Sequence, residues 1–311
     1  MATKKTKKEK FDIYKMITEK ITDQLAKGIV PWRKPWTGVV DGAISYVTRK
    51  PYSFLNQLLL GRAGEYLTPE EIKKRGGHIK KGAHASIVTF YSRILRNRQT
   101  EQTEDGEEIS VTIVKPHWTP ILRFYRVFHI DDVEGIESKI KKGKPAVSVK
   151  PVEKAEKVIN GYLAAEPHLK FHNDKPSNKA YFCPSTDEVV VPMITQYQDV
   201  EEYYSTTFHE LTHSTLTADR CDRTEENKNA PFGSEAYSRE ELVAEMGAAM
   251  LVNICGMEAD KAFKNSVAYI HGWLQKLQDD PKMIVWASSR AEKAARYIQG
   301  EREQKQVAKA A

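Results

Sequence analysis

The front of the chain begins with apolar positions at helical spacing. Over residues 11–29 they recur on one helix face, and Gly28 is expected to end that helix. A second helix is expected over 53–67. A third is expected from Thr68, because residues 68–71 have the sequence TPEE, typical of a helix cap followed by a first turn. The pattern therefore predicts three helices before the first long strand.

Two strands are expected next. Residues 85–95 and 120–130 are rich in β-branched and aromatic residues, a composition that predicts strands. The polar, acidic segment 97–109 between them is expected to be an exposed extension of a hairpin, with its strand pairing left open. Residues 141–150 lack periodicity and contain lysine, glycine and proline, so they form the expected linker.

The back half is expected to be mostly helical. A helix near 151–164 precedes two short strands, near 179–183 and 187–192. Further helices are expected near 200–217, 239–255, 259–278 and 281–299.

These patterns predict an α+β fold class with two domains. The front domain is α+β, and the second is mostly helical with a small antiparallel sheet. The expected boundaries are a disordered basic arm over 1–10, a first domain over 11–140, a linker over 141–150, a second domain over 151–300 and a flexible tail over 301–311.

Charge is divided unevenly between the two halves. Residues 1–150 hold 29 basic and 17 acidic side chains, whereas residues 151–311 hold 19 basic and 25 acidic ones. A basic half joined to an acidic half indicates that the front meets a polyanion. The alternative is a basic surface that is only solvated.

Neither a membrane segment nor an oxidising compartment is expected. The most apolar run, residues 246–257, is too short to span a bilayer, and no apolar segment of a secretory signal follows the basic N-terminus. The three cysteines form no C-x-x-C pair and are typical of reduced thiols. We therefore expect a cytoplasmic protein without a membrane partner.

The strongest chemical signal is TTFHELTHST at residues 206–215, which contains the pattern H-E-x-x-H. On a helix, His209 and His213 lie on one face about 6 Å apart, so both imidazoles can bind one zinc ion. Glu210 lies near the rim of that face and is the predicted general base. The alternative is a surface helix with two histidines and no metal.

A catalytic zinc needs a third protein ligand, and we expect a carboxylate from residues 237–250. We predict Glu241 as the ligand and Glu245, on the same helix face, as the residue that orients a ligating histidine. Glu240 is the main substitute for Glu241. The sequence from Ser238 to Glu241 also fits a capping box, so a cap at the helix start stays an alternative.

Other groups near the motif have two interpretations each. Tyr237, Tyr269 and His271 are candidates for stabilising an oxyanion, although each is also an ordinary packing residue. Residues 187–192 would hold an extended peptide if they formed an exposed edge strand. As a core strand they would not.

The basic half interleaves aromatic and basic residues, as proteins that bind single-stranded nucleic acid do. Glycines between the lysines near residue 77 would let the backbone approach phosphates. Either tryptophan could instead belong to a small core. The predicted DNA-binding residues are Trp32, Arg33, Lys34, Trp36, Arg49, Lys50, Tyr52, Lys73, Lys74, Arg75, Lys80 and Lys81.

Several long stretches resemble one known family. The front half resembles the N-terminal domain of ArdC-type antirestriction proteins, also present in plasmid primase-associated TraC proteins, through IVPWRKPW, ISYVTRKPYSFLNQLLL, YLTPEEIKKRGGHIKKGAHASIVTFY and FYRVFHIDDVEGI. The back half is similar to the zincin-like metallopeptidase domain of that family, through AYFCPSTDEVVVP, YYSTTFHELTHST, ADRCDR, YSREELVAEMGAAML and AYIHGWLQKLQDD.

The resemblance implies an antirestriction protein of a mobile element such as a plasmid, conjugative transposon or phage. Its front domain would bind single-stranded DNA, with double-stranded DNA as an alternative partner, and protect incoming DNA from host restriction enzymes. His209, Glu210, His213 and Glu241 match the metal motif, and the expected cofactor is zinc or another divalent metal such as manganese.

Two other functions stay open. One is an active, DNA-tethered zinc endopeptidase that cleaves a host restriction enzyme, another host protein or its own chain. The other is a non-catalytic protein that binds single-stranded DNA and has a structural metal site.

Overall fold

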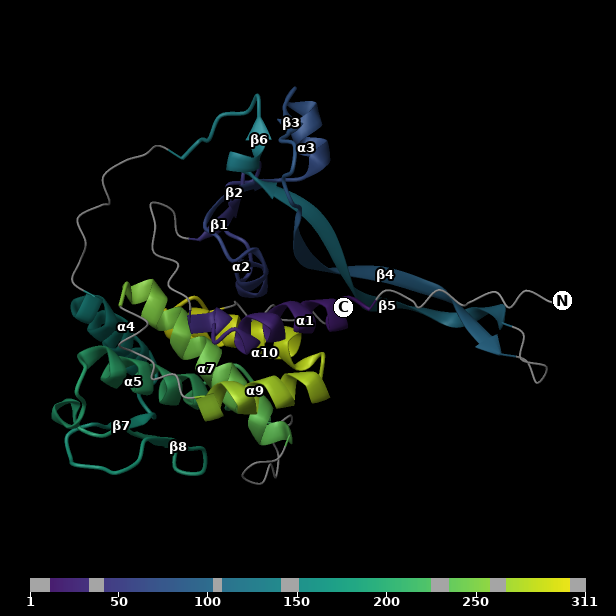
Figure 1. The fold of residues 1–311 in the computed structure, drawn as a ribbon. Helices are drawn as coiled ribbons and strands as arrows, with labels where there is room; N and C mark the ends of the chain where they lie inside the picture. Colours follow the sequence, from purple (N-terminus) through teal and green to yellow (C-terminus); the bar gives the residue numbers. More distant parts are fainter. Residues whose placement is uncertain are drawn as a thin grey trace. The chain divides into compact units, whose positions relative to one another are not determined.

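The computed structural model describes residues 12–33, 42–102, 108–140, 151–224, 235–257 and 267–302 (Figure 1). The predicted arm over 1–10, the linker over 141–150 and most of the tail over 301–311 lie outside these residues. The fold class is α+β, as predicted, and the chain forms two compact units. The first unit contains Tyr66–Glu137, and the second contains Tyr14–Glu65 together with the chain from Ser138 onward.

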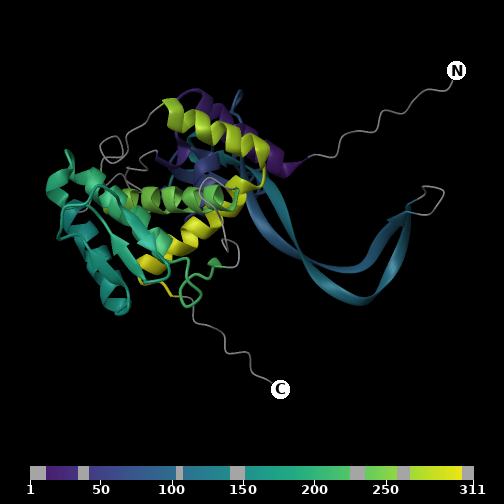
Figure 2. The same cartoon turned by 90° about the horizontal axis from the view of Figure 1, so that it is seen from below.

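A long two-stranded ribbon dominates the first unit (Figures 1 and 2). Its strands, β4 (Ser86–Gln102) and β5 (Glu108–His129), pair antiparallel, and their register shifts once, between Arg96 and Arg98. Both predicted strands are therefore confirmed. The described part of the acidic segment lengthens both strands, as expected of a hairpin extension.

A capped helix and a small sheet complete the first unit. In α3 (Pro69–Lys74), the Thr68 hydroxyl accepts a bond from the backbone N–H of Glu71, and the Glu71 carboxylate accepts one from that of Thr68, at 3.3 and 2.8 Å. The predicted helix start is therefore confirmed. The remaining elements are β3 (His78–Ile79), η2 (Ile130–Asp132) and β6 (Val133–Glu134), with β3 and β6 antiparallel.

The helix predicted over 53–67 is wrong in its second half. α2 (Phe54–Leu60) ends at Gly61, whose φ of 64° is left-handed and whose N–H donates to the carbonyl of Gln57. The chain then forms β2 (Gly64–Leu67), in which Tyr66 pairs with His129 of β5. Glycine in this conformation ends the helix, and the strand pairing fixes the residues that follow.

Residues 14–65 share a core with the C-terminal helices. This front segment holds α1 (Ile13–Ala26), η1 (Pro31–Arg33), β1 (Ala43–Ser45) and α2. The hydroxyl of Thr18 donates to the carbonyl of Pro281 at 2.8 Å, and the backbone N–H of Phe54 donates to the carboxylate of Glu292 at 2.9 Å. The compact units therefore divide the chain differently from the predicted domains.

The rest of the second unit is mostly helical. Its helices are α4 (Pro151–Ala165), η3 (Ile194–Gln196), α5 (Val200–Ser214), α7 (Glu235–Cys255), α9 (Val267–Asp279) and α10 (Met283–Ile298). None of the helices that the structure describes is long and apolar enough to cross a bilayer.

The small sheet of the second unit is mixed. Its strand order is β7 (Lys170–His172), β9 (Glu188–Val190) and β8 (Tyr181–Cys183), with β7 parallel and β8 antiparallel to β9. This corrects the predicted antiparallel sheet. The strand β7 was not predicted, because its three residues are too few to show a strand period.

Small residues bring α7 close to α5. A Cβ atom on Gly247 would lie 2.6 Å from the side chain of Thr212, so only glycine permits this approach. Ala244 and Ala248 are buried on the same helix. The close contact allows a carboxylate from α7 to reach the histidines of α5.

Candidate metal centre

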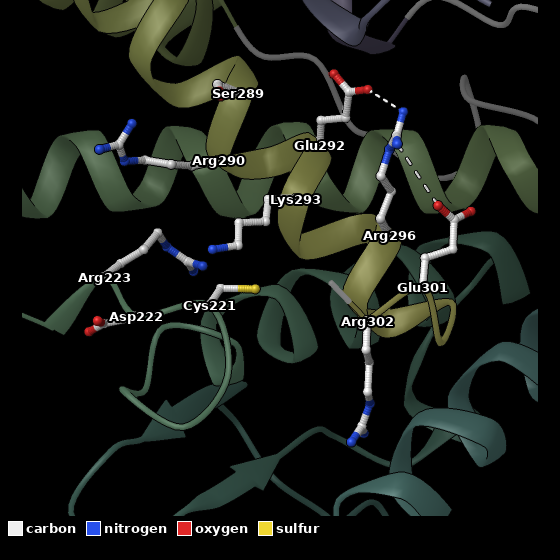
Figure 3. A pocket seen from close by; sticks show the side chains of 10 residues that line it. All are labelled: Cys221, Asp222, Arg223, Ser289, Arg290, Glu292, Lys293, Arg296, Glu301 and Arg302. Atoms are coloured by element: carbon white, nitrogen blue, oxygen red, sulfur yellow. Dashed lines mark hydrogen bonds and ion pairs between the residues drawn. The ribbon is translucent and has the colours of Figure 1, made fainter. Parts of the chain in front are cut away.

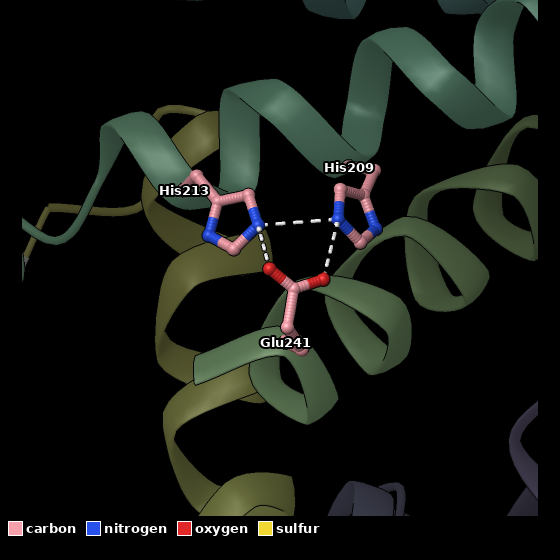
Figure 4. A group of neighbouring side chains, drawn as sticks. All are labelled: His209, His213 and Glu241. Carbon is pink, nitrogen blue, oxygen red and sulfur yellow. Dashed lines mark hydrogen bonds and ion pairs between the residues drawn. The ribbon is translucent and has the colours of Figure 1, made fainter. Parts of the chain in front are cut away.

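The two histidines of the motif and Glu241 meet at one point (Figure 4). The Nε2 atoms of His209 and His213 are 3.1 Å apart. The Glu241 carboxylate lies 3.6 Å from Nε2 of His209 and 3.5 Å from Nε2 of His213. Two imidazoles and one carboxylate are a donor set that catalytic zinc accepts, with a fourth position left open. The residues therefore fit a divalent metal ion.

Core packing of α5 holds the two histidines in place. Phe208 and Leu211 are fully buried and anchor the opposite face of the helix. The hydroxyl of Thr212 donates to the carbonyl of Phe208 at 2.7 Å, so a polar group in the core has a partner within the helix. The histidines are left on the face that lines a cleft.

Neighbouring carboxylates favour the protonated form of His213. Burial disfavours a charge on His213, but hydrogen bonds to Glu240 and Glu241 raise its pKa to about 10. Burial also opposes the charge of Glu241, yet hydrogen bonds from both histidines keep its pKa well below the usual range. A metal ion must therefore displace a proton from His213 when it binds.

Glu241 lies inside a helix rather than at its start. The chain is already helical at Glu235, so Ser238 is an interior residue and the capping-box alternative is wrong. Glu240, the substitute ligand, instead contacts Nδ1 of His213 at 3.4 Å. It takes the orienting position that we assigned to Glu245. Glu245 is half-buried one turn further along α7, and its role stays a prediction.

A buried arginine fixes Glu240. The guanidinium of Arg223 donates from Nε and Nη2 to the Glu240 carboxylate at 3.0 and 2.7 Å, and from Nη1 to the Thr215 hydroxyl at 3.0 Å. Arg223 is 2% exposed. A chain of contacts thus runs from Arg223 through Glu240 to His213. Arg223 was not predicted from the sequence, because its contact with Glu240 depends on the fold of the loop after the motif.

The Arg223–Glu240 pair also separates two pockets. Glu240 lines the metal cleft, whereas Arg223 lines a second pocket of about 630 Å³ (Figure 3). In that pocket Arg296 pairs with Glu292 and Glu301 at 2.8 and 3.9 Å. The Arg223–Glu240 ion pair is therefore part of the wall between the two pockets, behind His213.

Replacing Arg223 with methionine is expected to lower the affinity for zinc about 10- to 100-fold, the usual cost of removing a partner that orients a metal ligand. Without Arg223, the carboxylate of Glu240 would no longer be held in place, and the imidazole ring of His213 would lose the contact that orients it. Isothermal titration with zinc measures the change.

Arg220→Met is the matched control. Arg220 lies in the same loop, is 8% exposed and forms a two-point ion pair with Asp187 at 2.8 and 2.6 Å. The control should lower the melting temperature and leave zinc affinity near that of the wild type. Equal losses of zinc affinity in both variants would mean that Arg223 only stabilises the fold and does not orient His213.

The metal residues open into a cleft of about 610 Å³. One wall comes from β8, through Tyr181 and Phe182. Because β9 is central and β8 pairs on one side only among the described strands, the edge strand beside the metal residues is β8. Of the two alternatives for residues 187–192, the core strand is confirmed and the exposed edge strand is wrong, and Val189 at their centre is fully buried.

Glu210 and Tyr237 also line the cleft. Glu210 is 7% exposed, beside the two histidines on α5. Burial and the nearby Glu241 carboxylate raise the pKa of Tyr237 to about 12, so its phenol keeps its proton at neutral pH. His271 is exposed on α9, and the side chain of Tyr269 lies outside the described part. Of the two oxyanion candidates whose side chains are described, Tyr237 is the one that lines the cleft.

Trp32 is a core residue, so it has no face for a DNA base. Its side chain is fully buried, and its ring meets Trp273 edge-on at 6.4 Å between centroids. This corrects its inclusion among the DNA-binding residues. Lys34, Trp36 and the side chain of Arg33 lie outside the described part of the chain.

The remaining predicted DNA contacts divide between the two units. In the second unit, Arg49 pairs with buried Glu65, Lys50 is exposed and Tyr52 is half-buried. The other five are all exposed and lie in the first unit: Lys73, Lys74, Arg75, Lys80 and Lys81. Two of these side chains also have partners within the protein: Lys80 donates to the carbonyl of Asp131 at 2.8 Å, and Arg75 donates to that of Glu71 at 3.2 Å.

Two protein families match the chain. The N-terminal domain of anti-restriction factor ArdC matches residues 11–128, and a zincin-like metallopeptidase family matches residues 161–290. The chain is also similar to two crystal structures of the antirestriction ArdC protein from plasmid R388. The metal-free one is 28% identical with a TM-score of 0.68, and the Mn(II)-bound one is 26% identical with a TM-score of 0.67. Each match covers 94% of this chain and 98% of that one.

Curated relatives agree with these matches. A DNA primase TraC from Escherichia coli is 29% identical over 94% of this chain, and a second is 28% identical. This chain spans only 27% and 20% of their lengths. Uncharacterized protein y4eC from Sinorhizobium fredii is 26% identical over 96% of this chain and 95% of its own length. These matches give the chain an ArdC-type N-terminal domain followed by a zincin-like metallopeptidase domain, and over 94% of its length it is similar to the antirestriction ArdC protein.

Proposed function

We propose that this protein binds single-stranded DNA entering a cell, protects it from restriction and hydrolyses a peptide bond at its metal centre. The convergence of His209, His213 and Glu241 beside Glu210 in an open cleft carries the hydrolytic part of the proposal. The basic front half and the family carry the DNA-binding part.

Zinc is the proposed metal, held by His209, His213 and Glu241. When bound there, such an ion polarises a water molecule and the scissile carbonyl. Glu210 takes a proton from the attacking water as the new carbon–oxygen bond forms. It then gives that proton to the amide nitrogen as the carbon–nitrogen bond breaks.

Two other parts of the cleft would position the substrate. The edge of β8 that pairs with no strand in the described part of the chain can add an extended peptide as a further strand, which lays its backbone along the cleft. The protonated phenol of Tyr237 can donate a hydrogen bond to the carbonyl oxygen as negative charge develops on it. Both the β8 edge and the Tyr237 phenol would therefore contact the backbone of the substrate.

The DNA-binding part is tested by titrating the full chain against a labelled single-stranded oligothymidylate. We expect tight binding at low salt that weakens steeply as salt rises, because lysine and arginine displace counterions from phosphates. A duplex of equal length should bind more weakly, since its bases are stacked on each other. Absence of binding to the oligothymidylate at low salt would contradict the proposal.

A non-catalytic protein with a structural metal is the second candidate. The three-residue donor set favours the catalytic function over it, because structural zinc sites usually have four protein ligands. The variants of Glu210 and Glu241 described in the Discussion separate the two.

A further inference from the structure

Four exposed aromatic rings gather on the β4–β5 ribbon. Phe90, Tyr91, Phe124 and Tyr125 are 45%, 59%, 39% and 47% exposed. Within the described residues, the only other large aromatic side chain this exposed is Tyr181, which lines the metal cleft. Exposed rings concentrated in one element indicate a binding surface rather than a core.

The strand register divides these rings between two faces. Phe90 pairs with Arg123, and Tyr125 lies two residues further on the same face. The rings of Phe90 and Tyr125 touch, with centroids 5.5 Å apart.

The opposite face has the same composition. Phe124 pairs with Thr89 and Arg126 pairs with Ile87, so both share a face with Tyr91. Among the residues whose side chains the structure describes, each face therefore carries two exposed rings and one exposed arginine.

The charge of the ribbon suits a polyanion. Residues 83–100 and 109–130 contain six lysine and arginine residues and no acidic residue. The acidic residues of this region fall between 101 and 108, around the segment that joins the strands. Arg123 and Arg126 are exposed, and neither forms an ion pair with a residue that the structure describes. Their charges are therefore available to a ligand.

Single-stranded nucleic acid fits these features better than other occupants. Bases stack on exposed rings while arginines meet the phosphates, and a duplex does not offer its base faces in this way. A second copy of the ribbon would bring arginines against arginines, because residues 83–100 and 109–130 contain no carboxylate in either copy.

We propose that the β4–β5 ribbon is the contact surface for single-stranded DNA, with base stacking on Phe90 and Tyr125 and on Tyr91 and Phe124. This inference rests on the proposed DNA-binding function. It assigns base stacking to the ribbon and not to Trp32, which is buried. The lysines of residues 73–81 belong to the same unit and add electrostatic affinity.

Two double variants of the full chain test the proposal against a labelled oligothymidylate. Phe90→Val with Tyr125→Val, and Tyr91→Val with Phe124→Val, keep strand-forming residues and remove the rings. Each double variant should weaken binding about tenfold or more, because one stacked base contributes about a five- to 150-fold change in affinity. Arg123→Gln with Arg126→Gln should make the salt dependence shallower, by about 0.7 per arginine in the slope of log affinity against log salt.

Matched controls separate stacking from folding. Exchanging the rings, Phe90→Tyr with Tyr125→Phe, should leave affinity near that of the wild type. Val152→Ser with Ile194→Ser removes two side chains of similar exposure outside the ribbon and should also bind normally. Circular dichroism and thermal melting check that each variant is folded.

The outcomes distinguish this inference from the proposed function. If the wild type binds and both ring-removing variants bind equally well, the ribbon proposal is wrong and the DNA-binding function stands. If the wild type does not bind the oligothymidylate, the function itself fails. Self-association of the wild type that the ring-removing variants abolish, with DNA affinity unchanged, would assign the ribbon to a second copy and overturn the proposal.

Discussion

Glu241→Gln is expected to lower the affinity of the protein for zinc by more than about 100-fold, because loss of a ligand should exceed the 10- to 100-fold cost of losing an orienting partner. The carboxylate contacts both histidines at 3.5 and 3.6 Å, so its removal deprives the site of its only anionic ligand among the residues described there. Isothermal titration measures the affinity. Thermal melting with and without zinc measures how far the metal stabilises the fold.

Glu156→Gln is the matched control for this experiment. Glu156 also contacts α5, accepting a hydrogen bond from the hydroxyl of Tyr204 at 2.7 Å, and glutamine can still accept that bond. This variant should bind zinc like the wild type. Zinc binding by Glu241→Gln at wild-type affinity would mean that the metal lies elsewhere.

Glu210→Gln is expected to slow hydrolysis of labelled casein by about 100- to 10,000-fold, the usual contribution of a general base. Glutamine has nearly the same shape but cannot take the proton from water. Since Glu210 is not among the three ligand residues, zinc affinity should stay near that of the wild type.

The casein hydrolysis assay and the zinc titration also distinguish the alternative functions. Equal hydrolysis by the variant and the wild type would remove Glu210 from the mechanism. Zinc binding without hydrolysis in the wild type, with strong stabilisation by the metal, would favour the structural-metal function.

Only the part of the metal centre that lies within a single helix could be predicted from the sequence. Helix spacing alone brings His209 and His213 together, so the motif is sufficient for them. Glu241 depends on how α7 packs against α5, and the small residues around Ala244 and Gly247 were the available hint. Arg223 reaches Glu240 through the fold of a loop, which no local spacing encodes.

The partition of the chain could not be predicted for a related reason. The apolar stripe of α1 predicts a buried face, and Ile17, Ile21 and Leu25 are indeed fully buried. A stripe does not say what covers it, and here the segment from Tyr14 to Glu65 packs with the C-terminal helices. A chain that ended near residue 145, within the predicted linker, would lose the C-terminal helices that cover this core. The roles of the two halves are therefore better tested with variants of the full chain.

The position of the proposed DNA surface depends on exposure, which composition alone does not give. Aromatic and basic residues are interleaved in several stretches of the front half, but exposure decides which of them can meet a base. Trp32 is buried, whereas Tyr91 is the most exposed of the four ribbon aromatics. Sequence alone could not separate them because both have the same kind of neighbours.

The most direct measurement of the central claim is restriction of incoming unmodified plasmid DNA in cells that produce the wild-type protein or Glu210→Gln at equal levels. We predict that the wild type protects the plasmid and that Glu210→Gln loses protection while still binding zinc and single-stranded DNA. Full protection by Glu210→Gln would contradict the claim that the metal centre works as a hydrolase in this role.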